Sequence, residues 1–452
     1  MKILIAGCGK VGDALVRQLS ADGYDLTVID SNQQKLEALV EHYDVMALHG
    51  NCASMETLRQ AGVENADLLI VTTGSDEINM LCTMTAHGLN PRIHTVARIR
   101  NPEYTQQAYT MGDVFGLSLA FNPEKQAAVE IQRLLQYPGF LKRDVFAKGR
   151  VEIVELRIDA DSKLAGVPLS QMNAIIKCRV LVCAVLRDGT AVTPDGGFVL
   201  QAGDRIFVTA PSRDLSLLLK NLGIVSHKVR RVVIAGGGSV SYYLAEALAE
   251  QRVDVTIIEK NQERCLKLAE LLPDAKIICG DASNQSLLES EGLANADALV
   301  TLTSTDALNV IISMYGNSCG LPQIITKLDR LDDARIIDRL PVGSIICPKK
   351  LSSGTLIQYV RAMQNQTGAA VTVHTIADGN AEAMEFIMDD TSLHCGQPLK
   401  ELKLKKNIRI ACITHHGKID IPAGDSTFHK GDSVVIVVSG EDVILQFNDI
   451  FA

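Results

Sequence analysis

The sequence predicts an α/β protein made of two tandem units, each a parallel, doubly wound sheet followed by a small α+β domain. The first observation is that short β-branched runs alternate with helical patterns in residues 1–122, as in successive βαβ units. The second is a duplication, in which segment 3–30 matches segment 232–259 without a gap and at a constant offset. Further matching pairs are 50–79 with 280–309, and 196–210 with 424–438. Because chance does not keep three sub-segments in order, one unit of about 228 residues occurs twice.

Each unit divides again where the hydrophobic pattern changes. Five β-branched runs, followed by a sixth at 113–120, predict the strands of the first sheet. Residues 150–222 instead carry longer apolar runs separated by glycine turns, which favours antiparallel strands. Between these two parts, an apolar face at helical spacing begins at Pro123 and predicts a crossover helix. The predicted segments are 1–122 (first sheet domain), 123–139 (crossover helix), 140–225 (first small domain), 230–347 (second sheet domain), 348–365 (second crossover helix) and 371–452 (second small domain).

Composition and charge argue against several classes of protein. The net charge is −9 with no long basic stretch, which disfavours a protein that grips the backbone of nucleic acid. The apolar runs are strand-sized, far short of the roughly 20 residues of a membrane-spanning helix. The 11 cysteines include no C-x-x-C pair, which argues against disulfides or structural zinc. The scattered single cysteines suit a reducing compartment, so the protein is expected in the cytoplasm. The His415-His416 pair is expected in an exposed turn, and no metal site is predicted.

The first unit carries a G-x-G-x-x-G motif in the strand–turn–helix–strand context of a Rossmann-like site. The motif reads Gly7-Cys8-Gly9-Lys10-Val11-Gly12. Its first glycine permits a tight turn, the second lets a diphosphate approach the backbone, and the third lets the helix pack closely. Asp30 ends the strand that follows, at a distance from the motif where its carboxylate can accept ribose hydroxyls. This pattern favours NAD or adenosine phosphates over NADP, and the alternative is a glycine turn in a sheet without ligand.

The second unit repeats the motif with one change. The residues are Gly236-Gly237-Gly238-Ser239-Val240-Ser241, and Glu259 follows them at the same spacing as Asp30 follows the first motif. Ser241 replaces the third glycine and is small enough to keep the helix close to the strand. Glu259 can still bind a ribose. The alternative is a degenerate copy that binds nothing.

Polar residues also follow the third strand of each unit. Asn51-Cys52 in the first unit correspond to Asp281-Ala282 in the second. Ligands of open α/β sheets bind at the carboxyl ends of the strands, so these residues are candidates for contact with adenine or ribose. Helix capping is the alternative for Asn51 and Asp281, because Asn and Asp are favoured at helix N-caps.

The fourth and fifth strands of each unit end in further candidates. Thr73-Gly74 and Thr303 follow the fourth strands and offer hydroxyl or backbone donors. Arg98 and Lys327 end the fifth strands at matching positions, where a cation can bind a diphosphate by charge-assisted hydrogen bonds. A solvated surface charge is the alternative for both cations, and helix capping accounts for the nearby Asp76 and Asp306.

The sequence offers no catalytic residues to accompany these sites. No G-x-S-x-G, H-E-x-x-H or Walker motif occurs, and the small domains carry no convincing acid–base pair or nucleophile. A hydride-transfer enzyme needs a proton donor in a substrate domain. The sequence therefore predicts a protein that is not an enzyme. The alternative is an NAD-dependent oxidoreductase with an unrecognised substrate site.

Over essentially its whole length the chain resembles the TrkA family, the peripheral subunits of bacterial Trk potassium uptake systems, in which RCK units occur in tandem. The resemblance rests on ILIAGCGKVG with Asp30, HGN, ADLLIVTT, SDEIN and VARIR, together with their second copies. It implies RCK N-terminal and C-terminal domains, binding of NAD(H) or ATP/ADP, and a TrkH-type membrane partner that translocates potassium. It also implies a peripheral location at the inner face of the membrane.

The crossover helices suggest how such a chain assembles. Their apolar stripes lie between a large and a small domain and can pack against a neighbouring chain, which predicts a homo-oligomer. The family resemblance implies a tetramer that forms a gating ring. The alternative is that both stripes complete the cores of their own domains.

Overall fold

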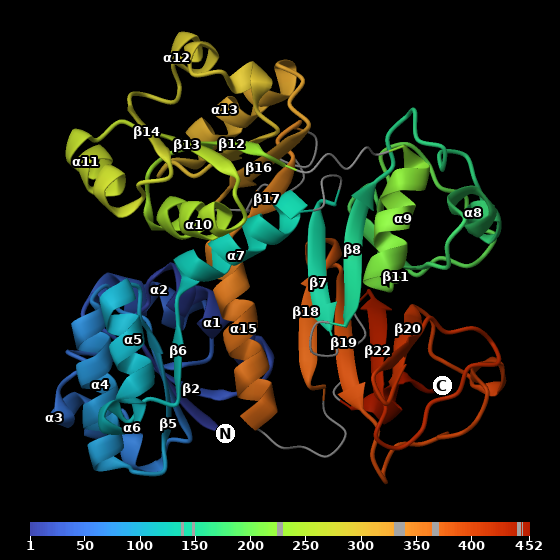
Figure 1. Cartoon of the computed structure of the whole chain (residues 1–452). Helices are drawn as coiled ribbons and strands as arrows, with labels where there is room; N and C mark the ends of the chain where they lie inside the picture. The colour runs from blue at the N-terminus through green and yellow to red at the C-terminus, as the bar shows by residue number, and fades with distance from the viewer. Residues whose placement is uncertain are drawn as a thin grey trace. The chain divides into compact units, whose positions relative to one another are not determined.

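The computed structural model describes residues 1–136, 140–146, 150–223, 229–329, 340–363, 370–440, 444 and 446–452. These residues form two compact units. The first comprises Met1–Ala128 and Cys347–Val360, and the second comprises Val129–Ile346 and Arg361–Ala452 (Figure 1). Within the described ranges, no helix combines the length and the apolar character that a membrane crossing requires.

The first sheet is parallel with strand order β3-β2-β1-β4-β5-β6, which confirms the predicted doubly wound topology. Strand β1 is buried along most of its length, as expected of a strand covered on both faces. The strands are β1 (Lys2–Ala6), β2 (Asp25–Asp30), β3 (Met46–His49), β4 (Leu68–Val71), β5 (His94–Arg98) and β6 (Leu119–Phe121). The helices are α1 (Lys10–Ala21), α2 (Gln33–His42), α3 (Met55–Gln60), η1 (Val63–Asn65), α4 (Asp76–Leu89), α5 (Pro102–Thr110) and α6 (Gly112–Phe115).

The sixth strand differs from its prediction. The hydrophobic pattern predicts an extended run throughout 113–120, but helix α6 occupies the first part of it. Gly116 ends this helix in the left-handed conformation (φ +57°), which a glycine adopts without strain. Only Leu119–Phe121 pairs with β5, so the apolar run is divided between a short helix and a short strand.

The second parallel sheet repeats the topology in the order β14-β13-β12-β15-β16-β17. This confirms the duplication at the level of the fold. The strands are β12 (Arg231–Ala235), β13 (Asp254–Glu259), β14 (Lys276–Cys279), β15 (Ala298–Thr301), β16 (Gln323–Lys327) and β17 (Ser344–Ile346). The helices are α10 (Ser239–Glu250), α11 (Gln262–Leu271), α12 (Gln285–Ser290), η3 (Leu293–Asn295) and α13 (Asp306–Ser318).

The small domains are antiparallel, as predicted, with orders β10-β9-β11-β8-β7 and β18-β19-β22-β20-β21. The first contains β7 (Lys142–Phe146), β8 (Val151–Arg157), α8 (Leu169–Ile176), β9 (Leu181–Arg187), β10 (Thr190–Val192), β11 (Arg205–Ala210) and α9 (Ser212–Leu222). The second contains β18 (Thr372–Ile376), η4 (Ala377–Gly379), β19 (Ala381–Ile387), η5 (Leu399–Glu401), β20 (Ile408–His415), β21 (Lys418–Asp420), β22 (Ser433–Ser439) and η6 (Phe447–Ile450).

The two small sheets pack face to face around a shared core, a feature that the sequence did not predict. Phe146 and Phe207 of the first sheet and Val435 and Val437 of the second belong to one buried cluster. The other face of the first sheet packs against α8 and α9 (Figure 1). Strand β8 is therefore buried on both faces.

The crossover helices are α7 (Pro123–Gln136) and α15 (Pro348–Met363), and their predicted ends at 137–139 and 364–365 fall outside the described residues. The apolar stripe of α7 is buried within this chain. Each of its side chains is at most 3% exposed: Ala127, Ala128, Ile131, Leu134 and Leu135. In the first unit Ser352 Oγ of α15 donates to Gln126 Oε1 of α7 at 2.8 Å. In the second unit Gln323 Nε2 donates to the Leu134 carbonyl at 2.7 Å. The stripe of α7 thus completes cores of its own chain.

Candidate functional site

The predicted site residues of each sheet gather at one edge because the strands are parallel. Gly7 directly follows β1, Asp30 ends β2, and Arg98 ends β5. Asn51 and Thr73 each stand two positions beyond their strands. The second sheet places its equivalents in the same way. The backbone topology therefore brings both sets of candidates to the carboxyl edges that the sequence indicated.

The first glycine turn has the geometry of a phosphate-binding loop. Gly7 has φ +97°, and a Cβ at this position would lie 2.9 Å from the backbone nitrogen of Thr73. A Cβ at Gly12 would lie 2.0 Å from the Gly7 carbonyl oxygen, so the absence of a side chain lets α1 pack on the turn. A Cβ at Gly9 would meet nothing within 4 Å, and Gly9 is the N-cap of α1. The turn is therefore tight at both ends and open in the middle.

Asp30 holds this loop through its carboxylate. Oδ2 accepts the N–H of Cys8 at 2.6 Å, and Oδ1 accepts the N–H of Asn32 at 2.8 Å. A carboxylate has about four acceptor positions, so two remain for ribose hydroxyls. The thiol of Cys8 is buried, and burial with Asp30 nearby raises its pKa to about 12. Cys8 can therefore contribute only its backbone to a site.

The second glycine turn repeats this arrangement. Glu259 Oε2 accepts the N–H of Gly237 at 2.7 Å, and Oε1 accepts the N–H of Asn261 at 2.8 Å. A Cβ at Gly238 would again meet nothing within 4 Å. Arg264 Nε donates to the Gly237 carbonyl at 2.7 Å, which places a guanidinium against this loop.

Two substitutions in the second copy compensate for each other at the glycine turn. In the first copy Thr72 Oγ1 donates to the Gly7 carbonyl at 2.8 Å. In the second copy Leu302 replaces Thr72, and Ser241 Oγ donates to the Gly236 carbonyl at 2.6 Å. A hydroxyl directly after β4 therefore satisfies the buried turn carbonyl in the first copy, and a hydroxyl from α10 does so in the second.

The residues after the third strands are exposed and do not cap the following helices. Asn51 Oδ1 accepts the N–H of Ala53 at 3.0 Å, whereas the N-cap of α3 is Ser54. Asp281 Oδ1 accepts both the N–H and the hydroxyl of Ser283 at 2.8 Å, and these bonds lower the pKa of Asp281. The capping alternative is therefore wrong for both residues. The neighbouring side chains of Cys52 and Ala282 are buried in the cores.

Sequence reasoning missed a buried asparagine that joins the fourth and fifth strands. Asn79 is fully buried, and its Oδ1 accepts the N–H of Thr73 at 3.0 Å and the Thr73 hydroxyl at 2.6 Å. Its Nδ2 donates to the Arg98 carbonyl at 2.7 Å. In the second copy Asn309 makes the same bonds to Thr303 and to the Lys327 carbonyl. The only sequence signal was the spacing of Asp76 and Asn79 three residues apart, which recurs as Asp306 and Asn309.

The acids in that spacing bind the segment after the fifth strand. Asp76 Oδ2 accepts the N–H groups of Arg100 and Asn101 at 2.8 and 2.7 Å, whereas the N-cap of α4 is Ser75. Asp306 accepts the N–H of Asp329 at 3.0 Å. The capping interpretation of both acids is therefore wrong. The two acids fix the segment that follows β5 in the first copy and β16 in the second.

The cation at the end of β5 is partly desolvated. Arg98 Nη2 donates to the Thr73 carbonyl, and burial, followed by the nearby Arg100, lowers the pKa of Arg98. Its Nε is buried and has no hydrogen-bond partner within the described ranges. A guanidinium with an unused donor, adjacent to Thr73 and hence to the glycine turn, suits an anionic ligand. Lys327 is half-buried at the equivalent position of the second copy.

These features define a class of protein: one with two Rossmann-like sheets, each with a glycine turn open at its middle and an acid at the end of the second strand. The TrkA-N domain family matches residues 3–116 and 232–348, and the TrkA-C domain family matches residues 153–223 and 383–452. The chain belongs to the TrkA family, as tandem pairs of TrkA-N and TrkA-C domains.

Relatives match over nearly the whole length. A Trk system potassium uptake protein TrkA homolog of Archaeoglobus fulgidus is 30% identical over 98% of this chain and 98% of that protein. The Trk system potassium uptake protein TrkA of Halomonas elongata is 31% identical over 97% of this chain and 96% of that protein. The fold resembles the GsuK RCK domain, with a TM-score of 0.61 at 15% identity, over 97% of this chain and 92% of that one.

Proposed function

We propose that this protein is the regulatory subunit of a potassium uptake system, and that it binds NAD(H) and ATP or ADP and gates a TrkH-type membrane partner. The observation that carries the proposal is the duplicated open glycine turn, in a chain whose full-length relatives are named Trk system potassium uptake proteins. In this proposal the protein resides in the cytoplasm, attached to the inner face of the membrane through its partner.

The geometry supports an assignment of each part of the ligand. The diphosphate lies over Gly9 or Gly238, at the start of α1 or α10, where space is open. Asp30 or Glu259 accepts the ribose hydroxyls, and its negative charge disfavours a 2′-phosphate. The remaining contacts come from the other residues of the two glycine turns, from Asn51, Cys52, Thr73, Gly74 and Arg98 in the first site, and from Asp281, Ala282, Thr303 and Lys327 in the second.

Two solved structures with a similar fold are nucleotide complexes. The GsuK channel bound to NAD has a TM-score of 0.60 to this chain at 16% identity, and GsuK bound to ADP has a TM-score of 0.50 at 13% identity. These likenesses establish the fold alone. They motivate testing dinucleotides and adenosine phosphates side by side.

The test of the proposal is a titration of NAD, NADH, ATP and ADP against the full chain, with stoichiometry, and then potassium uptake with the membrane partner present. We expect saturable binding of at least one nucleotide and a nucleotide-dependent change in potassium flux. A coupling of about 1–3 kcal/mol would shift the equilibrium between the two states of the transporter about 5- to 150-fold. Identical flux with every nucleotide and with none contradicts gating.

The alternative function, an NAD-dependent oxidoreductase, is tested in the same preparation. NADH is incubated with the protein and a panel of carbonyl compounds, and the absorbance of NADH is followed. A regulatory site leaves the NADH concentration constant, whereas sustained loss of absorbance favours the enzyme.

We also propose a homo-oligomer, a tetramer, with a different contact surface from the crossover helices. Helix α4 exposes Ile78, Leu81 and Met84, and α13 exposes Ile311 and Met314 at the positions equivalent to Leu81 and Met84. These side chains are 38–62% exposed, and each set lies along one helix face. One chain thus presents the same apolar stripe twice, which suits repeated contact between identical chains.

Charged substitutions in both stripes are expected to dissociate the oligomer. The double variant Leu81→Glu/Ile311→Glu places a carboxylate at the centre of each contact, and burying unpaired charges there costs several kcal/mol. Light scattering measures the molar mass. Val40→Glu is the control, because Val40 is 51% exposed on a different helix. An unchanged mass of the double variant, or a monomeric parent, contradicts assembly through these stripes.

A further inference from the structure

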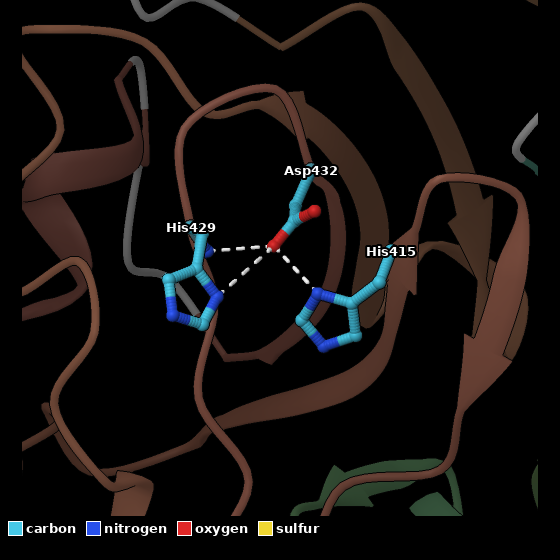
Figure 2. Close-up of side chains that lie close together, drawn as sticks. All are labelled: His415, His429 and Asp432. Carbon is cyan, nitrogen blue, oxygen red and sulfur yellow. Dashed lines mark hydrogen bonds and ion pairs between the residues drawn. The ribbon is translucent and has the colours of Figure 1, made fainter.

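Two histidines and a buried aspartate converge in the second small domain. His415 ends β20, Asp432 immediately precedes β22, and His429 lies in the loop before it. The ligand atoms of the three side chains lie within 4.8 Å of one another. Figure 2 shows both imidazole rings beside the carboxylate of Asp432. The prediction that His415 lies in an exposed turn is wrong, because His415 pairs with Lys418 within the sheet and is half-buried.

The Asp432 carboxylate is the most buried group of this cluster. The Asp432 side chain is 4% exposed, whereas those of His415 and His429 are 33% and 60% exposed. Asp432 Oδ2 accepts the backbone N–H of His429 at 2.6 Å and lies 2.7 Å from His415 Nδ1. The His429 Nδ1 lies 3.8 Å from the same oxygen. The cluster is therefore anchored in the core and open to solvent on the histidine side.

The first small domain supplies an internal comparison, because it holds the same acid with a different partner. Positions 415, 429 and 432 correspond to Arg187, Gln201 and Asp204 in the duplicated unit. Arg187 donates from Nε and Nη2 to the two carboxylate oxygens of Asp204, each at 2.7 Å. The N–H of Gln201 donates to Asp204 Oδ2 at 2.8 Å, just as that of His429 does to Asp432. The duplication thus kept the buried acid and its backbone contact.

What changed is the cation. Asp204 has a permanent positive partner in a bidentate pair, whereas the ion-pair partners of Asp432 among the described residues are the two histidines alone. Imidazole is a common metal ligand in proteins. A buried carboxylate without a permanent cation, flanked by two imidazole rings, is a donor set for a metal ion.

We propose that His415, His429 and Asp432 bind a divalent transition-metal ion of the zinc type, with water as the fourth ligand. Two nitrogens and one carboxylate oxygen are typical ligands of Zn²⁺. Ligands about 2.0–2.2 Å from a tetrahedral ion lie roughly 3.3–3.6 Å apart. The contacts of 2.7 and 3.8 Å to Asp432 Oδ2 bracket this spacing, so the two imidazole rings must shift relative to the carboxylate to bind the ion.

The first copy also provides a variant that should fold. His415→Arg/His429→Gln recreates the Arg187–Asp204 arrangement, so Asp432 keeps a partner while both imidazole ligands are lost. His416→Gln is the matched control, because His416 is exposed and adjacent in sequence but lies outside the cluster. The exposed cysteines are the same in the parent, the double variant and the control, so any Zn²⁺ that they bind cancels in the comparison.

The experiment is calorimetric titration of the tag-free full chain with ZnCl₂ in a non-chelating reductant, together with thermal unfolding with and without Zn²⁺. We expect one more Zn²⁺ per chain in the parent and in His416→Gln than in the double variant. We also expect Zn²⁺ to raise the unfolding temperature of the parent and of His416→Gln, but not that of the double variant. With Co²⁺, the parent and the control should show the visible absorption of a four-coordinate ion. Equal Zn²⁺ stoichiometry and affinity in the parent and the double variant overturns the proposal.

Discussion

Gly9→Asp is expected to abolish nucleotide binding at the first site while the domain remains folded. The backbone of Gly9 has φ −75°, which any residue adopts, and a Cβ there meets no atom within 4 Å. The substitution therefore introduces no clash in the free protein. The new carboxylate, however, stands where the diphosphate is proposed to bind, at the open middle of the turn. Steric exclusion and charge repulsion then act on the ligand alone.

The size of the effect follows from the charges. Two like charges about 4 Å apart at a protein surface repel by roughly 4 kcal/mol. Each change of about 1.4 kcal/mol is a tenfold change in affinity, so a loss of at least about 100-fold is expected. In calorimetric titration, the full-length variant should bind one nucleotide fewer per chain than the parent.

The duplicated fold supplies the matched control for this variant. Gly238→Asp makes the same change at the second turn, where a Cβ also meets nothing. It should remove binding at the second site and leave the first unchanged. Gly9→Ala is the milder comparison, since a methyl group narrows the path without adding charge. Unaltered nucleotide affinity in both aspartate variants means that the ligand does not lie over these glycines.

The residues that could be predicted from the sequence are those with a local cause. Gly7 needs a positive φ, Gly12 needs close approach of a helix, and Asp30 stands at a fixed distance along one βαβ unit. Each of these requirements is contained in about 30 consecutive residues, so the motif and its spacing determine the geometry. The parallel, doubly wound character of the sheet was predicted from the same repeated units.

Other features depend on contacts between distant segments, and no local pattern signals them directly. Asn79 acts through bonds to strands on either side of it, and its polar character alone suggested no such role. The convergence of His415 and His429 on Asp432 requires the pairing of β20 with β22. The face-to-face packing of the two small sheets likewise appears only in three dimensions.

Removing the Asn79 amide is expected to destabilise the carboxyl edge of the first sheet. In Asn79→Ala, the N–H of Thr73 and the carbonyl of Arg98 lose the hydrogen bonds that the fully buried Asn79 side chain makes with them. Each unsatisfied buried group costs about 1–3 kcal/mol, so a local loss of about 3 kcal/mol is expected. Nucleotide affinity at the first site should also fall, because Thr73 and Arg98 both border that site.

The measurement must be local, because a chain with several domains does not unfold in one two-state step. Hydrogen exchange of peptides containing β4 and β5 reports the opening free energy of this region directly. Asn309→Ala should produce the same loss around β15 and β16 and leave the first sheet unchanged, since Asn309 makes the equivalent bonds there. Val40→Ala, on the exposed face of α2 and outside the proposed contact stripes, should change the exchange by less than about 0.5 kcal/mol. If Asn79→Ala changes the exchange no more than Val40→Ala does, water or a local shift replaces the amide, and Asn79 does not hold the two strand ends together.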